Sequence, residues 1–218
     1  MSLTEQLENL NDYYKENRDT FNDNFRLKMH RTLSWLKKAN EEENLDFKFI
    51  ALWIAFNAAY ADELSKKEIE RKVFHQFITR LCELDSEHLL YGIIWDEFPG
   101  TVKALLDTPY TFQPFWDAHN GLLAGKEWKV MFSAAKKKAH FAFEEQKTAE
   151  VLEVVFGHLY TLRNQLIHGG ATYESSTNRK QIEESCALLS LFVPAMVKIM
   201  LRNDSEPSWG KPFYPVVK

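Results

Sequence analysis

The chain of 218 residues has a net charge of −4, with 45% hydrophobic and 14% aromatic residues, and this composition excludes a wholly disordered protein. The acidic balance excludes a general polyanion binder, so any contact with nucleic acid has to come from local basic patches. The two cysteines, Cys82 and Cys186, exclude a disulfide framework and fit a reducing compartment.

No segment of the sequence has the pattern of a targeting signal. The N-terminus is polar and does not resemble a secretory signal peptide. The longest apolar run, from Phe49 to Ala61 with only Asn57 interrupting it, is too short to cross a bilayer, which takes about 20 residues. We therefore expect a cytoplasmic protein with no membrane partner.

Apolar residues recur at spacings of three and four along most of the chain, which is typical of amphipathic helices. Prolines and glycines interrupt the pattern over residues 86–125, where we expect an insertion of short helices, and prolines indicate an extended tail over 204–218. The sequence thus predicts an all-α fold and a single domain over residues 1–218. The predicted long helices cover residues 3–17, 22–39, 47–62, 65–84, 126–146, 148–168 and 178–203.

The predicted helix 22–39 carries Arg26, Lys28 and Arg31 in a stretch that has no acidic residue between Asn24 and Asn40. A solvated face is the ordinary explanation of such a run. The alternative is a track for the RNA backbone, because phosphates are bound by Lys and Arg. On this reading, Arg26, Lys28 and Arg31 bind RNA, and reversing their charge weakens RNA binding more than reversing Lys136–Lys138 does.

Asn57 is the one polar side chain in the apolar stretch of the predicted helix 47–62. A buried amide destabilises the fold unless it is hydrogen-bonded. We therefore expect Asn57 either to bond a neighbouring helix or to orient an Arg or His side chain of the candidate site described below.

The insertion is dense in aromatic residues, and the helix that follows it carries a second basic patch. Packing in a core is the ordinary interpretation of these rings, and stacking on RNA bases is the alternative. A solvated face is likewise the ordinary interpretation of the lysines. The residues concerned are Tyr91, Trp95, Phe98, Tyr110, Phe112, Phe115 and Trp116 among the aromatics, and Lys126, Lys129, Lys136, Lys137 and Lys138 among the lysines.

The hexad from Arg163 to His168 closes the predicted helix 148–168 and runs into Gly169-Gly170, a pair typical of a helix end. At about 100° per residue, Asn164 and His168 share one face, whereas Arg163 and His168 diverge by about 140°. Either the last turn is distorted, or a second copy of the chain completes the site. The partial negative charge at a helix C-terminus also favours cationic side chains there, so the residues are equally typical of simple helix capping.

The R-N-x-x-x-H pattern of the hexad, together with Phe25–Leu36 and Phe49–Tyr60, resembles the HEPN superfamily of nucleotide-binding domains, in particular bacterial proteins of the Apea-like kind. The resemblance implies a four-helix bundle core formed by helices 22–39, 47–62, 148–168 and 178–203, with additional helices around it. It also implies metal-independent cleavage of RNA, in toxin–antitoxin, defence or stress settings, with no cofactor and no metal.

Within this resemblance, His168 is the acid and base, Arg163 stabilises the charge on the phosphorane, and Asn164 orients His168 or the phosphate. The expected partners are a second copy of the chain, RNA, and an antitoxin or other protein. Two alternatives stay open, because they require the same bundle. One is a non-catalytic HEPN-like module that binds RNA, nucleotide or protein, and the other is a helical scaffold in which Arg163 and His168 only cap a helix.

Overall fold

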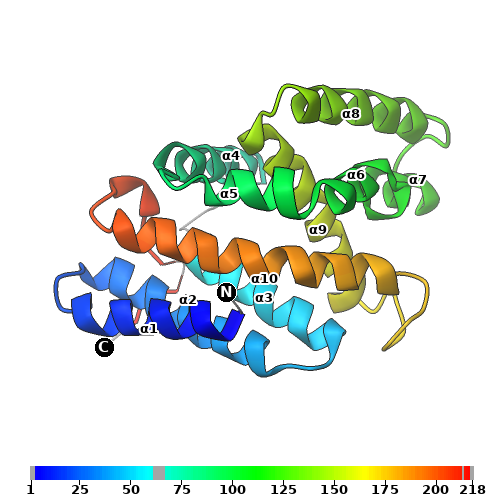
Figure 1. The fold of residues 1–218 in the computed structure, drawn as a ribbon. Helices are drawn as coiled ribbons and strands as arrows, with labels where there is room; N and C mark the ends of the chain where they lie inside the picture. The colour runs from blue at the N-terminus through cyan, green and yellow to red at the C-terminus, as the bar shows by residue number, and fades with distance from the viewer. Residues whose placement is uncertain (1–2, 61–66, 213, 217–218) are drawn as a thin grey trace. The chain divides into compact units, whose positions relative to one another are not determined.

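The structure, a computed structural model, describes residues 3–60, 67–212 and 214–216 and contains helices and no strand in these residues. The predicted all-α fold is thereby confirmed (Figure 1). The α-helices are α1 (Leu3–Asn17), α2 (Asp23–Glu41), α3 (Leu45–Tyr60), α4 (Lys67–Leu84), α5 (Leu89–Gly92), α6 (Pro99–Asp107), α7 (Gln113–His119), α8 (Glu127–Glu144), α9 (Thr148–Ile167) and α10 (Arg179–Arg202). A π-helix, η1 (Ile93–Glu97), and two 3-10 turns, η2 (Pro109–Thr111) and η3 (Pro207–Trp209), complete them.

The chain divides into two compact units. Unit 1 comprises residues 1–90 and 182–218, and unit 2 comprises residues 91–181. The residues predicted as an insertion therefore belong mainly to unit 2, where they associate with α8 and α9. The predicted helix 47–62 ends, and the predicted helix 65–84 begins, within residues 61–66. These residues lie outside the described part of the chain.

Helix α2 packs against both α1 and α3 in unit 1 (Figure 1). The side chain of Asn22 accepts a hydrogen bond from the backbone N–H of Phe25, at 3.0 Å, and so caps the start of α2. The apolar stripe of α2 is buried as its spacing predicts, and each such side chain stabilises the fold by roughly 1.5–3 kcal/mol. The buried residues of this stripe are Phe25, Met29, Leu33 and Leu36.

The segment that follows α10 folds back on unit 1 and is not wholly extended. Pro207–Trp209 form the turn η3, and the Trp209 side chain is only 3% exposed. The indole Nε1 of Trp209 donates to the carbonyl of Asn203 at 2.6 Å. Arg80 on α4 pairs with Glu206 just before the turn, at 2.5 Å. These contacts fix a segment that the sequence predicts as an extended tail.

Helix α10 combines length with a highly apolar stretch. It is long and apolar enough to cross a membrane, and 72% of its most apolar window is buried within the protein. A core helix of a soluble protein meets the same criterion, so this feature decides nothing about a membrane.

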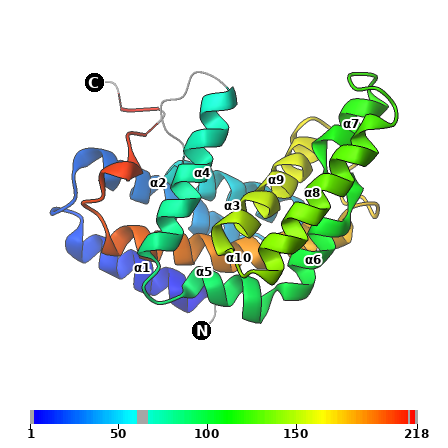
Figure 2. The same ribbon diagram turned by 90° about the horizontal axis from the view of Figure 1, so that it is seen from above.

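Helix α8 lies alongside α6, α7 and α9 in unit 2, and α9 also contacts α6 and η2 (Figure 2). The π-helix η1 is tied to the start of α9, because the indole Nε1 of Trp95 donates to Thr148 Oγ1 at 3.2 Å. The Trp95 ring also packs against Phe143 of α8, with 4.5 Å between the ring centroids. Within unit 2, α9 thus packs against elements that precede it in the chain.

Candidate active site

The hexad lies at a regularly formed helix end. Gly169 adopts a φ of +69°, the left-handed conformation that glycine takes without strain, and this confirms the prediction from the glycine pair. Its N–H donates to the carbonyl of Leu166 at 3.3 Å, and the N–H of Gly170 donates to that of Gln165 at 2.7 Å. This pair of bonds is the Schellman arrangement, so α9 ends without distortion and His168 occupies the capping position.

The two sides of α9 differ in exposure. Leu152, Val155, Leu159 and Leu162 are fully buried, as their spacing predicts. His168 and Tyr160 are exposed, and Asn164 between them is half-buried. Because Tyr160, Asn164 and His168 follow one another at intervals of four, they lie along one accessible face of the helix.

The side chain of Arg163 bends toward this accessible face. Its Nη1 donates to Asn164 Oδ1 at 2.8 Å. Its guanidinium carbon lies 5.9 Å from the centroid of the Tyr160 ring, a cation–π distance. The backbone positions of Arg163 and His168 still diverge on the helix, but the guanidinium itself is held beside Asn164. The charged group of Arg163 thus lies nearer to the face of Asn164 than its backbone position alone indicates.

Arg163 and His168 form no hydrogen bond with each other in the part of the chain that the structure describes. An exposed imidazole and a half-buried amide nevertheless lie along one helix face, with a guanidinium bonded to the amide. Such a set supplies a proton donor or acceptor at His168 and a two-pronged hydrogen-bond donor for a phosphate at Arg163.

The predicted RNA-binding residues of α2 are engaged within unit 1. Lys28 is fully buried and its Nζ donates to the carbonyl of Trp209 at 2.6 Å, so its expected role in an exposed phosphate track is corrected. Arg31 donates to the carbonyl of Tyr214 at 2.6 Å, and Arg26 pairs with Asp23, also at 2.6 Å. Lys28 and Arg31 therefore help to hold the C-terminal segment, whereas Arg26 pairs within its own helix.

Asn57 is half-buried on α3 rather than fully buried. The free-energy cost of leaving its amide without a hydrogen bond inside the protein is correspondingly smaller. It belongs to unit 1 and the hexad belongs to unit 2, so its expected role in orienting the hexad stays a prediction.

The structure adds two neighbours of the hexad that sequence reasoning did not single out. Tyr160 lies under Arg163, and its spacing of three residues from Arg163 is a signal that was present in the sequence. Gln165 donates from Nε2 to the carbonyl of Tyr110 at 2.7 Å. No sequence signal points to that contact, because it joins residues 55 positions apart.

His158 has a structural position inside unit 2. Its Nδ1 lies 2.7 Å from Thr111 Oγ1, and both side chains are buried. Burial lowers the pKa of His158 to about 4, and the contact with Thr111 opposes this shift. His158 is therefore neutral at physiological pH and anchors η2 to α9.

Within the described ranges, no group of three or more His, Cys, Asp or Glu side chains is arranged to hold a metal ion. Comparison of the chain with protein-family models, with curated proteins and with solved structures found no match. The HEPN resemblance accordingly rests on the sequence motifs quoted above, and the function has to be argued from the geometry of the hexad.

Proposed function

We propose that this chain is a HEPN-like, metal-independent endoribonuclease whose active site is the hexad at the end of α9. The observation that supports it most is the position of the Arg163 guanidinium, over Tyr160 and bonded to Asn164 on the face that bears His168. Such an enzyme fits a toxin or defence setting, in which a protein partner of the antitoxin kind restrains cleavage.

The proposed chemistry is displacement at phosphorus by the neighbouring 2′-hydroxyl. A base removes the proton of this hydroxyl while its oxygen attacks, and an acid protonates the departing 5′-oxygen. His168 exchanges these protons. Arg163 stabilises the negative charge that develops on the phosphorane oxygens, and Asn164 holds the guanidinium in place. The products are a 2′,3′-cyclic phosphate and a 5′-hydroxyl.

A symmetric dimer is part of the proposal for a chemical reason. In-line displacement calls for proton transfer on opposite sides of the phosphorus, and one His168 does not serve both sides easily. A second copy across a two-fold axis supplies the other imidazole. The accessible face of α9 is the proposed interface, because Gly157 on it is exposed and an added Cβ there would meet no atom within 4 Å.

The test of catalysis compares the wild-type protein with Arg163→Ala and His168→Ala on a mixed RNA pool, with and without a chelator. Each substitution lowers cleavage by at least about 10²-fold, as expected for loss of an acid/base or a charge stabiliser. Gln146→Ala, at an exposed loop position before α9, is a matched control and cleaves normally. Undiminished cleavage by both hexad variants contradicts the assignment.

The test of the dimer mixes the Arg163→Ala and His168→Ala proteins after subunit exchange has been verified by mass spectrometry. A shared site regains part of its cleavage in the heterodimer. A mixture that stays as inactive as either parent shows that each chain uses its own Arg163 and His168.

The second candidate is a non-catalytic RNA-binding module. It is favoured by one observation, the exposed lysines of α8, which do not depend on the hexad. A wild-type protein that binds RNA and leaves it intact under all conditions tested identifies this alternative.

A further inference from the structure

The segment from η2 to the start of α8 presents aromatic rings to solvent. Helix α7 has no buried residue, although it contains Phe115 and Trp116. Tyr110 is 59% exposed, and its ring meets that of Phe115 edge-on, with the centroids 5.5 Å apart. Phe115 also contacts the rings of His119 and Trp128, at 4.1 and 4.9 Å. These rings pack on one another, and none of the residues of α7 is fully buried.

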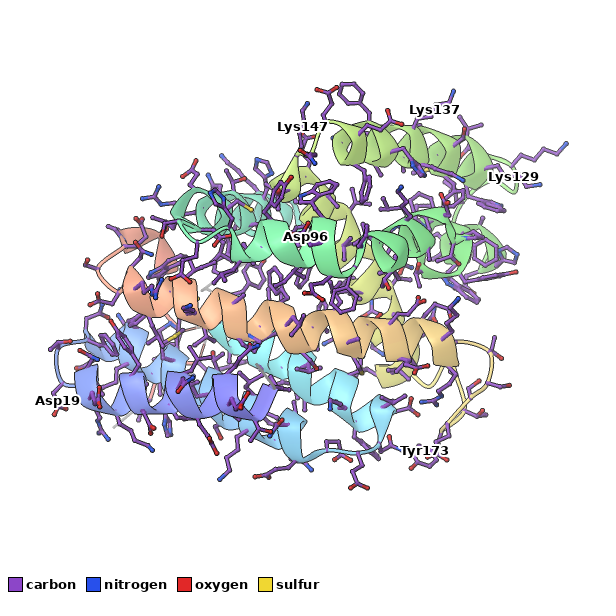
Figure 3. The ribbon with its side chains drawn as sticks, viewed as in Figure 1. Asp19, Asp96, Lys129, Lys137, Lys147 and Tyr173 are labelled. Atoms are coloured by element: carbon purple, nitrogen blue, oxygen red, sulfur yellow. The ribbon has the colours of Figure 1, made fainter. Side chains whose placement is uncertain are left out.

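A stripe of lysines borders this aromatic cluster. Lys126 and Lys129 stand at the start of α8, and Lys137 lies two to three turns further along the same side of the helix. All three are exposed and form no salt bridge within the described residues. Figure 3 shows Lys129 and Lys137 projecting away from α8. These lysines are therefore available to an anionic ligand.

The neighbouring cations and acids leave this surface positively charged. Residues 109–140 contain five lysines and two acidic residues, a net of +3 in a chain whose net charge is −4. Lys136 differs from the stripe, because it pairs with Asp107 at 2.9 Å. The two acids are Asp117, which accepts a hydrogen bond from Gln113 at 2.9 Å, and the exposed Glu127. The local balance favours a polyanion over an acidic or neutral partner.

The aromatic cluster is joined to the hexad through one backbone carbonyl. The carbonyl oxygen of Tyr110 accepts from Gln165 Nε2 at 2.7 Å and from Trp116 Nε1 at 2.8 Å. Gln165 stands one helical turn before His168. The position of the Tyr110 backbone is thus fixed from the hexad on one side and from α7 on the other.

We propose that Tyr110, Trp116, His119 and the stripe Lys126, Lys129 and Lys137 form a binding surface for single-stranded RNA, which continues from the hexad. Tyr110 stacks on a base next to the scissile phosphate, and the lysines hold the backbone of the strand beyond it. Aromatic rings beside a row of cations are the combination that binds single strands without regard to sequence. The inference that this surface delivers RNA to a cleavage site rests on the proposed function, whereas the binding itself does not.

The test measures the affinity of a fluorescein-labelled 2′-O-methyl oligouridine by fluorescence anisotropy. This probe lacks the free 2′-hydroxyl that the proposed cleavage needs, so binding is measured without turnover. Tyr110→Ala lowers affinity about tenfold, as expected for the loss of one stacked base, and Tyr110→Phe keeps wild-type affinity. Tyr110→Ala retains the carbonyl that Gln165 and Trp116 bind, so the fold of the segment is preserved.

A second probe separates stacking from charge. On the same oligonucleotide with abasic sites, Tyr110→Ala binds as well as the wild type, whereas Lys129→Glu with Lys137→Glu lowers the affinity for both probes about tenfold. Tyr13→Ala and Lys37→Glu replace exposed residues of α1 and α2 and serve as matched controls, with affinity unchanged.

The outcomes separate this inference from the proposed function. Failure of the wild type to bind either probe, or an equal loss by Tyr110→Ala on both, overturns the binding surface. If the surface binds RNA as described but RNA cleavage does not depend on Arg163 and His168, the nuclease assignment is contradicted and the binding surface is supported. If cleavage depends on the hexad and Tyr110→Ala binds the oligouridine as well as the wild type does, the nuclease assignment is supported and the binding surface is contradicted.

Discussion

Helix α2 in unit 1 and helix α8 in unit 2 each carry several cations within a few turns, and their charged groups have different surroundings. On α2, Lys28 is buried against the carbonyl of Trp209, and Arg31 donates to the carbonyl of Tyr214. On α8, Lys129 and Lys137 are exposed and form no salt bridge within the described chain, and Lys129 lies over the ring of its neighbour Trp128. A basic run therefore indicates a nucleic-acid surface only after the protein's own carbonyls and carboxylates have been considered.

The α2 cations act on the fold because they reach a segment distant in sequence. Lys28 and Trp209 are 181 positions apart. A buried ammonium that is hydrogen-bonded to a carbonyl avoids the large cost of an unsatisfied charge. Reversing or removing such a charge is expected to damage folding, whereas reversing an exposed lysine of α8 is expected to alter binding alone.

The largest expected effect is a difference in stability between charge reversals on α2 and on α8. Lys28→Glu places a carboxylate against the Trp209 carbonyl and lowers the free energy of unfolding by about 4 kcal/mol or more. Lys129→Glu changes it by less than about 0.5 kcal/mol, as is usual for exposed sites. Urea denaturation of both variants provides the comparison.

Lys28→Met serves as the intermediate control, because it keeps the aliphatic stem and removes the charge. It leaves the Trp209 carbonyl without its donor and lowers the free energy of unfolding by about 1–3 kcal/mol. Equal stability of Lys28→Glu and Lys129→Glu would mean that α2 and α8 do not differ as described.

The second-largest expected effect is a difference between the two units in how their stability depends on pH. Burial lowers the pKa of His158 in unit 2 to about 4, from an ordinary value of 6.5. Between these values the unfolded state binds a proton and the native state does not, so stability falls as pH drops from 6.5 to 4, by on the order of 3 kcal/mol. Above pH 6.5 this contribution is fully present. Urea denaturation of the wild type and of His158→Gln across this range gives the measurement.

The expected result is a flatter pH dependence for His158→Gln than for the wild type. In unit 1, the hydrogen bond from Arg80 lowers the pKa of Glu206 below its ordinary 4.5. The stability from this pair is present above pH 4.5 and is lost only as pH falls through the lowered pKa. Hydrogen exchange near pH 5 should accordingly increase in unit 2 before unit 1. The opposite order would contradict the role assigned to His158.

The smallest expected effect concerns the salt dependence of RNA binding. Each lysine that contacts a phosphate of a single strand contributes about 0.7 to the slope of log affinity against log salt concentration. Lys129→Glu with Lys137→Glu should therefore reduce that slope by about 1.4 or more. Arg26→Glu, whose partner Asp23 lies on the same helix, should leave the slope unchanged. A slope that responds to Arg26 and not to the α8 lysines would reverse the comparison.

The long helices were predictable because burial imposes a regular spacing on their apolar residues. The stripe of α2 is buried where the spacing predicts, and that of α9 is buried from Leu152 to Leu162, with Leu166 half-buried; α9 ends at the glycine that takes a positive φ. Local chemistry sufficed for these features, since each depends on residues within one or two turns.

The surroundings of the candidate site were not predictable to the same degree. The bond from Gln165 to the Tyr110 carbonyl and the burial of Lys28 both join segments far apart in sequence. The bend of Arg163 toward Asn164 depends on a side-chain rotamer, which the helix period does not determine. Spacing alone therefore predicted the divergence of the Arg163 and His168 backbone positions but not the contact of the guanidinium with Asn164.

The most direct test of the nuclease assignment is the dependence of cleavage on a single 2′-hydroxyl. An RNA oligonucleotide is cut in the presence of EDTA, the main cleavage position is mapped, and the nucleotide on its 5′ side is then replaced by its 2′-deoxy form. We expect cleavage at that position to be abolished, and the unmodified RNA to give a 2′,3′-cyclic phosphate and a 5′-hydroxyl. Undiminished cutting of the deoxy-substituted RNA, or a 5′-phosphate product formed only with added Mg²⁺, would contradict it.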